Sequence, residues 1–311
     1  MTVVAVAGGT SGLGRAIVEE FREHPEFSLF VLSRQEYPDL EKELGYPILA
    51  IDYDNPDEIT QLLQDKNVEI VISCINYLTA LQPEINLIKA ADQAHTVTRY
   101  IPSIWGSFHY GPEQAHIPEI KPKLVIMDAM EKSRSLEYMA IYNGYFLDYY
   151  GVPHVKSYLT NICICVDMQS NVAGIPGSGD VPVTFTYTFD IAKFTIASLS
   201  LPKWPKESYI IGDKVTWNEF IQIAEEAKGV KFEIHRDSLE DLRVGKITEL
   251  PNQKHVYESW PNDQARKLFS QFGLWCEAGM LDHRPAHSLN DDFPGIKPVT
   301  VREFLEKAWR K

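Results

Sequence analysis

The 311-residue chain has few cysteines, no excess of basic residues and no long apolar run. Its four cysteines, Cys74, Cys163, Cys165 and Cys276, have neither metal-ligand spacing nor the pattern of a disulfide framework. The net charge of −13 argues against nucleic acids and anionic membranes as partners, since both require a basic surface. No segment has the length of a membrane span, and no basic leader precedes the first apolar run. We therefore expect a cytoplasmic protein without a metal, a nucleic-acid partner or a membrane anchor.

A glycine-rich turn stands at the start of the chain, between a short apolar run and an amphipathic segment. Residues 3–7 lead into Gly8-Gly9-Thr10-Ser11-Gly12-Leu13-Gly14, and residues 16–21 follow. This order is typical of the strand, phosphate loop and helix of a dinucleotide site. Gly8 permits the tight turn, Gly12 lets the backbone approach a pyrophosphate, and Gly14 allows close contact between helix and strand. The N–H groups at the start of the helix would face the phosphates.

The end of the second apolar run, residues 27–32, indicates the type of coenzyme. It is followed by Ser33 and Arg34, where an NAD site usually has an acidic residue for the ribose hydroxyls. Arg34 can bind a 2′-phosphate through two parallel hydrogen bonds, and Ser33 can donate another. The alternative is a surface arginine, with Glu36 as the ribose-binding acid. The pattern favours NADP(H).

Strand-like and helix-like segments alternate through the first half of the chain, which predicts a parallel sheet with helices on both faces. Strands are expected over residues 3–7, 27–32, 47–51, 69–74, 99–103 and 138–141, with helices over 56–66, 81–94 and 121–133. The fold class is α/β, a Rossmann-type doubly wound parallel sheet with a smaller α+β C-terminal substrate lobe. Residues 1–153 plus about 188–212 are assigned to the NADP-binding domain, and about 154–187 and 213–311 to the substrate-binding lobe.

Beyond about residue 150 the alternation is weaker. Residues 157–166 and 181–189 resemble strands around a Gly/Pro loop at 174–179, with Cys163 and Cys165 on one face of the first. The helix expected at 190–199 and a short strand at 209–211 would return to the main sheet. Further helices are expected over 217–228, around 240–242, and over 263–272 and 301–310.

Several strings together resemble the NmrA-like and isoflavone-reductase-like branch of the short-chain dehydrogenase superfamily. They are the glycine loop, Ser33-Arg34, Arg99-Tyr100-Ile101-Pro102-Ser103-Ile104-Trp105-Gly106, Lys121-Pro122-Lys123-Leu124, Tyr142-Asn143-Gly144-Tyr145-Phe146 and Asp190-Ile191-Ala192-Lys193-Phe194. The resemblance covers residues 1 to about 212 and continues more loosely to the end. It implies an NADPH-dependent reductase of an aromatic or polyketide-like small molecule, of the kind found in fungal secondary metabolism. Two alternatives stay open: an NADP(H)-binding sensor without turnover, and a redox-neutral isomerase, dehydratase or cyclase on the same fold.

The resemblance also points to a catalytic lysine. None of the 15 tyrosines has a lysine four residues on, so the Tyr-x-x-x-Lys mechanism of ordinary short-chain dehydrogenases is excluded. In the reductase branch a single lysine serves instead, and motif order places it at Lys121, with Lys123 as the neighbouring alternative. Near a nicotinamide and a helix N-terminus, the ammonium form of Lys121 would be disfavoured. It could then hold the ribose and polarise or protonate an oxygen. Two departures from the family pattern are Ser11, where glycine is common, and Ile104, where the family has glutamate.

The remaining site residues follow from these motifs and from the rule that ligands bind at the carboxyl ends of parallel strands. The expected coenzyme residues are Gly8, Gly9, Thr10, Ser11, Gly12, Leu13, Gly14, Ser33, Arg34, Asp52, Cys74, Asn76, Ser103 and Lys121. The expected pocket for an aromatic substrate consists of Trp105, Phe108, Tyr110, Asn143, Tyr145, Phe146 and Tyr149. Core packing is the alternative explanation for the last two. A monomer or a homodimer is expected.

Overall fold

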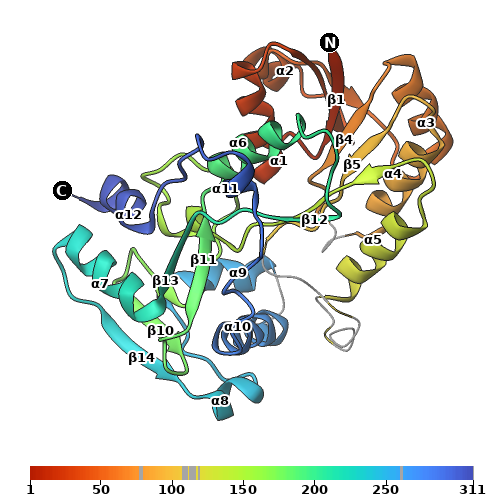
Figure 1. Cartoon of the computed structure of the whole chain (residues 1–311). Coiled ribbons are helices and arrows are strands. Elements are labelled where there is room, and N and C mark those ends of the chain that lie inside the picture. Colours follow the sequence, from red (N-terminus) through yellow and green to blue (C-terminus); the bar gives the residue numbers. More distant parts are fainter. Residues whose placement is uncertain (77–79, 107–110, 112–116, 118–119, 260–261, 311) are drawn as a thin grey trace.

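The computed structural model describes residues 1–76, 80–106, 111, 117, 120–259 and 262–310. Six parallel strands form the main sheet in the order β3-β2-β1-β4-β5-β6, which confirms the predicted Rossmann-type fold (Figure 1). The strands are β1 (Thr2–Ala7), β2 (Phe27–Ser33), β3 (Ile48–Ala50), β4 (Ile70–Ser73), β5 (Arg99–Ile101) and β6 (Glu137–Tyr138). The order reverses between β1 and β4, and dinucleotides bind at such a switch point.

Helices cover both faces of this sheet. Alternate residues of β1 point to opposite sides, so Val4 and Val6 join one buried cluster while Ala5 and Ala7 join the other. The first cluster includes residues of α1 (Gly12–Glu20) and α6 (Thr188–Ser198), which contact each other, and α2 (Pro38–Leu44) contributes Leu44. The second cluster includes residues of α3 (Pro56–Asp65), α4 (Gln82–Gln93) and α5 (Lys121–Lys132). Burial on both faces explains why these strands are apolar throughout.

The late strand that was expected to return to the main sheet lies instead in a separate two-stranded sheet beyond the end of β6. After β6 the sixth strand continues as β7 (Ala140–Tyr142), and β12 (Glu207–Tyr209) pairs with β7 in parallel. The helix α6 precedes β12 and packs on α1.

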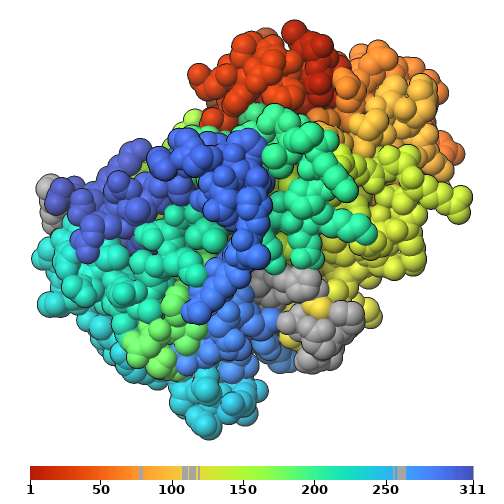
Figure 2. Space-filling model, viewed as in Figure 1, coloured from red at the N-terminus to blue at the C-terminus, as the bar shows by residue number. Residues whose placement is uncertain are grey.

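The C-terminal part contains two small sheets. One has the order β14-β10-β9 and the other β13-β11-β8. The strands are β8 (Tyr145–Phe146), β9 (Val166–Asp167), β10 (Val172–Pro176), β11 (Pro182–Thr186), β13 (Asp213–Thr216) and β14 (Glu233–Asp237). The helices are α7 (Trp217–Lys228), α8 (Leu239–Arg243), α9 (Lys254–Ser259), α10 (Asn262–Glu277), α11 (Leu289–Asp292) and α12 (Val301–Trp309). Figure 2 shows the cyan residues of this part, which include α7, β14 and α8, at the end of the molecule opposite the N-terminal strands, whereas α11 contacts α6.

Two predictions for this part were wrong. No strand covers residues 157–165, and Cys165 has a φ of +61°, which breaks the extended alternation expected for Cys163 and Cys165. The loop predicted at 174–179 is shorter, because Gly174 to Pro176 belong to β10. There, a β-carbon on Gly174 would lie 2.7 Å from the Thr248 side chain, so this glycine serves close packing within a strand and not a turn.

Candidate coenzyme and substrate site

The glycine loop takes a shape that only glycine permits. Gly8 has a φ of +74°, and a β-carbon there would lie 2.7 Å from the backbone oxygen of Cys74. A β-carbon on Gly14 would lie 2.3 Å from the backbone oxygen of Gly8. The first turn of α1 therefore lies directly against the end of β1, as the loop pattern predicts.

A pocket opens beside this loop, at the carboxyl ends of β1, β2 and β4. Several predicted coenzyme residues line it together: Gly8, Thr10, Ser11, Ser33, Arg34, Cys74 and Asn76. Arg34 is exposed at its rim, where a 2′-phosphate could be reached. The pocket thus joins the phosphate loop to the basic residue that follows β2, which is the arrangement an adenine dinucleotide phosphate needs.

Apart from Ile75, which lies between the predicted Cys74 and Asn76, the rest of the lining was not predicted. It consists of Leu32, Tyr37, Tyr53, Ile75, Ala80 and Pro83. Tyr53 lies one residue beyond the predicted Asp52; its side chain is buried and its hydroxyl donates to the backbone oxygen of Leu32 at 3.4 Å. Asp52 is exposed, does not line the pocket, and accepts a hydrogen bond from the backbone N–H of Asp54. The one sequence signal that could have indicated Tyr53 is an aromatic residue two positions beyond the end of the predicted strand 47–51.

The other predicted coenzyme residues do not line this pocket. Gly9, Gly12, Gly14 and the buried Leu13 form the loop and the base of α1. The Ser103 hydroxyl is directed inward and donates to the backbone oxygen of Ile75 at 2.7 Å.

The two candidate lysines differ in their surroundings. Lys121 begins α5 and is exposed. Lys123 is 5 % exposed, and its Nζ donates to the backbone oxygens of Ile104, Trp105 and Gly106 at 3.2, 3.1 and 3.4 Å. Burial lowers the pKa of Lys123 to about 7, although the three oxygens favour its charged form. Lys123, the neighbouring alternative, therefore has the disfavoured ammonium form that was expected of Lys121.

The oxygens around Lys123 lie just past the end of β5, next to the strand whose end borders the coenzyme pocket. Three half-buried aromatic residues of the predicted substrate pocket lie near them. Trp105 donates from Nε1 to the backbone oxygen of Ser73 at 2.7 Å, and the Phe146 ring lies beside Gly106. Tyr149 packs edge-on against Phe146, with ring centroids 6.0 Å apart.

Two other predicted pocket residues have structural contacts. Asn143 is fully buried, and its Oδ1 accepts from the backbone N–H of Gly106 at 2.8 Å. Tyr145 packs among core rings, with its centroid 4.6 Å from that of Phe272. The predicted Phe108 and Tyr110 lie outside the described residues.

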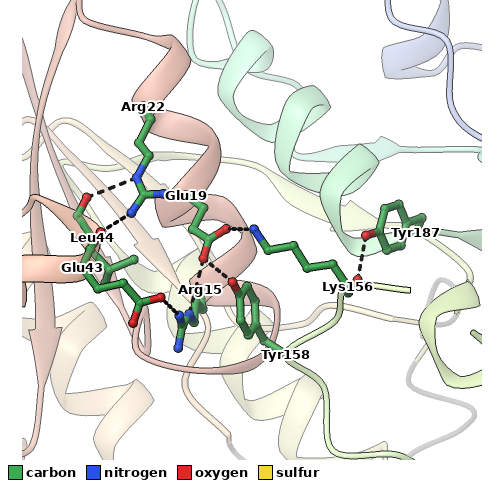
Figure 3. A network of polar contacts seen from close by, with 8 residues as sticks. All are labelled: Arg15, Glu19, Arg22, Glu43, Leu44, Lys156, Tyr158 and Tyr187. Carbon is green, nitrogen blue, oxygen red and sulfur yellow. Dashed lines mark hydrogen bonds and ion pairs between the residues drawn. The ribbon is translucent and has the colours of Figure 1, made fainter. Parts of the chain in front are cut away.

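A charged network ties the glycine-loop helix to residues 156–158 (Figure 3). The Glu19 carboxylate accepts from the Lys156 ammonium and the Tyr158 hydroxyl, and Arg15 Nε lies 3.5 Å from it. The Arg15 guanidinium also lies over the Tyr158 ring, 4.1 Å from the centroid. In addition, the Gly12 N–H donates to the backbone oxygen of Tyr158 at 3.1 Å. The position of α1 is therefore fixed partly by a segment from beyond the sixth strand.

The described part of the chain lacks the features of a metal site and of a membrane span. It contains no group of three or more His, Cys, Asp or Glu side chains placed to hold a metal ion. Among the same residues, no helix combines the length and the apolar character of a membrane span.

Comparison with known proteins agrees with this picture. The model of the NmrA-like family matches residues 1–305. "Oxidoreductase BOA1" of Botryotinia fuckeliana is 36 % identical over 309 residues, which cover 98 % of each chain. Among solved structures, "AtPrR2 with NADP+ and (+)pinoresinol" has a TM-score of 0.72 at 21 % identity, over 98 % of both chains. "Crystal Structure of Isoflavone Reductase" has a TM-score of 0.71 at 18 % identity, over 98 % of this chain and 99 % of the other.

Proposed function

Because the chain belongs to the NmrA-like family, we propose that it is a reductase that transfers hydride from NADPH to an aromatic or polyketide-like small molecule. The relative BOA1 carries the name oxidoreductase, and AtPrR2 was solved with NADP+. The pocket beside the glycine loop, with Arg34 at its rim, supports the phosphorylated coenzyme. Residues 1–153 and about 188–212 would form the coenzyme-binding domain, and the rest the substrate-binding lobe.

The observation that carries this proposal is the buried ammonium of Lys123 just beyond the end of β5. A coenzyme that starts at the ends of β1 and β2 and runs past β4 directs its nicotinamide toward β5. NADPH supplies the hydride when bound. Lys123, whose pKa is lowered by burial to about 7, can then give a proton to the substrate oxygen as a carbonyl becomes an alcohol. We therefore assign the proton-donor role to Lys123 and not to Lys121.

The aromatic substrate class rests on Trp105, Phe146 and Tyr149. Their half-buried rings lie near the backbone oxygens that hold Lys123, so a flat ligand could pack on them with its oxygen near the ammonium. AtPrR2, of the same fold, was solved with (+)pinoresinol.

The test combines coenzyme binding with turnover. Purified protein is titrated with NADPH by calorimetry, and NADPH absorbance is then followed with a panel of aromatic ketones, enones and (+)pinoresinol. Lys123→Met should lower kcat about 100-fold or more, while the Kd for NADPH changes less than about twofold. Lys121→Met, two residues away and exposed, is the matched control and should keep wild-type kcat within about twofold.

The outcomes separate the alternative functions. The absence of binding heat for NADPH and NADP+ would overturn the proposal. Binding without turnover of any panel compound would favour a sensor. Product formation without loss of NADPH absorbance would favour a redox-neutral enzyme, and a larger effect of Lys121→Met would return the proton-donor role to Lys121.

A further inference from the structure

A buried carboxyl group lies beneath the candidate site and takes no part in the proposed reaction. Glu84, in the first turn of α4, is fully buried. Its carboxylate accepts from three donors: the Ser73 hydroxyl at the end of β4, the Tyr100 hydroxyl in β5 at 3.2 Å, and the Ser103 N–H just after β5 at 3.0 Å. None of the three donors is charged. One side chain therefore joins the ends of two neighbouring strands.

Further hydrogen bonds join the residues that follow β4 to the residues that follow β5. Ser103 donates its hydroxyl to the backbone oxygen of Ile75, and Trp105 donates its indole N–H to the backbone oxygen of Ser73, each at 2.7 Å. The Ile75 N–H in turn reaches the Ser73 hydroxyl oxygen at 3.4 Å. Residues 73–75 and 103–105 are thus linked to each other and, through Ser73 and Ser103, to Glu84.

These two segments form different parts of the candidate site. Cys74 and Ile75 line the coenzyme pocket, whereas Ile104 and Trp105 supply backbone oxygens to the Lys123 ammonium. The distance between coenzyme and proton donor therefore depends on how the two segments are held. Displacements of about 1 Å can lower catalytic rates about 100-fold.

We propose that Glu84 is a positioning residue. It fixes the coenzyme-binding segment 74–76 relative to the backbone oxygens of residues 104–106, which accept hydrogen bonds from Lys123. The inference rests on the proposed function, because it gives Lys123 a role beside the coenzyme. An ionisable group buried among neutral donors is costly for stability, and such groups concentrate at functional sites. A carboxylate also matches this place chemically, since its two oxygens accept all three hydrogen bonds.

The ionisable groups facing Glu84 come from three other segments. They are Tyr53 after β3, Cys74 after β4 and Tyr100 in β5. Burial raises the pKa of each, so all three stay neutral near pH 7. Burial also raises the pKa of Glu84 itself to about 7. Its hydrogen bond with Ser73 can therefore run in either direction near neutral pH, and the hydroxyl can turn accordingly.

The test uses Glu84→Leu, which removes every acceptor at similar volume, with Tyr100→Phe as matched control. Tyr100→Phe removes one hydrogen-bond donor to Glu84, but Tyr100 lies inside β5 and belongs to neither of the two linked segments 73–75 and 103–105. Two quantities are measured on the full-length protein: the Kd for NADPH and the rate of Lys123 acetylation by acetic anhydride, read by mass spectrometry with Lys121 as internal reference. Neither quantity requires the natural substrate.

We expect Glu84→Leu to raise the Kd for NADPH about tenfold and the relative acetylation rate of Lys123 about tenfold, while Tyr100→Phe changes each less than about twofold. Equal effects of both variants would mean a purely structural role and would overturn the inference, as would unchanged values in Glu84→Leu.

Glu84→Gln keeps the inference testable if Glu84→Leu does not fold. It keeps one acceptor oxygen for Tyr100 and Ser103 but presents an amide N–H₂ to Ser73, so the Kd for NADPH should rise about threefold. No change in Glu84→Gln, with Glu84→Leu unfolded, would count against the inference. If wild-type protein does not bind NADPH, the proposed function fails, while Lys123 acetylation still reports on the position of the lysine.

Discussion

Two glutamates of the coenzyme-binding part show how the type of hydrogen-bond donor decides the behaviour of a buried carboxylate. Glu19, on α1, is 8 % exposed and binds the Lys156 ammonium and the Tyr158 hydroxyl (Figure 3). Glu84, on α4, is fully buried and binds neutral donors. Both accept hydrogen bonds from side chains outside their own helix, yet of the two only Glu19 has cations beside it.

The pKa values of the two carboxyls shift in opposite directions. Burial alone would raise the pKa of Glu19, but hydrogen bonds from Lys156 and Tyr158, with the charges of Lys156 and Arg15, hold it below its ordinary value. For Glu84, burial dominates and raises the pKa to about 7, although Ser73, Ser103 and Tyr100 donate to it. Neutral donors therefore stabilise a buried carboxylate less than nearby cations do. Glu19 therefore stays charged and keeps its ion pairs near neutral pH, whereas Glu84 can change its protonation state there.

Removing the Glu84 side chain should have the largest effect on stability. Glu84→Ala leaves the donors of Ser73, Tyr100 and Ser103 buried without their acceptor, so we expect a loss of about 3 kcal/mol in the free energy of unfolding. Urea denaturation followed by circular dichroism measures it. Glu19→Ala, whose partner Lys156 is 55 % exposed and can turn to water, is the control and should lose less. A larger loss in Glu19→Ala would reverse the comparison.

The second largest effect concerns the pH dependence of stability, which should differ between the two glutamates. Because the folded-state pKa of Glu84 is raised to about 7, folded protein holds a proton that the unfolded chain releases above about pH 4.3. The contribution of Glu84 is thus fully present below about pH 4.3 and declines, by up to about 1.4 kcal/mol per pH unit, until about pH 7. Asp148, whose pKa burial raises to about 6, titrates in the same range, so the quantity to measure is the difference between wild type and Glu84→Gln. A difference that stays constant from pH 4.5 to 7 would contradict the assignment.

Local sequence was sufficient to predict the parts of the site that depend on neighbouring residues. Gly8, Thr10 and Ser11 follow β1, Ser33 and Arg34 stand at the end of β2, and the structure places these five residues on one pocket. The helices α3, α4 and α7 agree with their predicted ranges within a residue or two, because helix starts carry visible signals such as Asn55 before Pro56.

The parts that depend on packing could not be predicted. Lys121 and Lys123 are two residues apart on one helix, about 200° around its axis, so only the contacts of α5 decide which one is buried. Glu84 resembles any acidic residue in the first turn of a helix, and its burial follows from the approach of β4 and β5. Tyr53 enters the pocket for a similar tertiary reason, since three separate strand ends meet there.

The charge of Glu19 should matter less than the acceptor atoms of Glu84. Glu19→Gln keeps the volume but removes the ion pairs with Lys156 and Arg15, and we expect a loss of about 1 kcal/mol at pH 7. Since the folded-state pKa of Glu19 is lowered, its contribution is present above about pH 4.3 and disappears as the pH falls through the folded value. Unfolding curves of wild type and variant should therefore converge in acid. Glu43→Gln is the matched control and should have the smaller effect, because the exposed Glu43 carboxylate binds Arg15 and the change leaves its backbone oxygen, which accepts from Arg22, in place.

Replacing Lys156 should have the smallest effect on stability. Its dependence on salt should differ from that of the buried hydrogen bonds around Glu84. Its side chain is 55 % exposed, so Lys156→Gln should lose only about 0.5 kcal/mol. At about 0.5 M NaCl the screening length falls to a few ångströms, and the difference between wild type and Lys156→Gln should shrink toward zero. The difference between wild type and Glu84→Gln should stay the same, because the Glu84 carboxyl is fully buried. Equal salt sensitivity of the two variants would mean that water and ions reach Glu84, and the contrast between the two glutamates would then be one of degree.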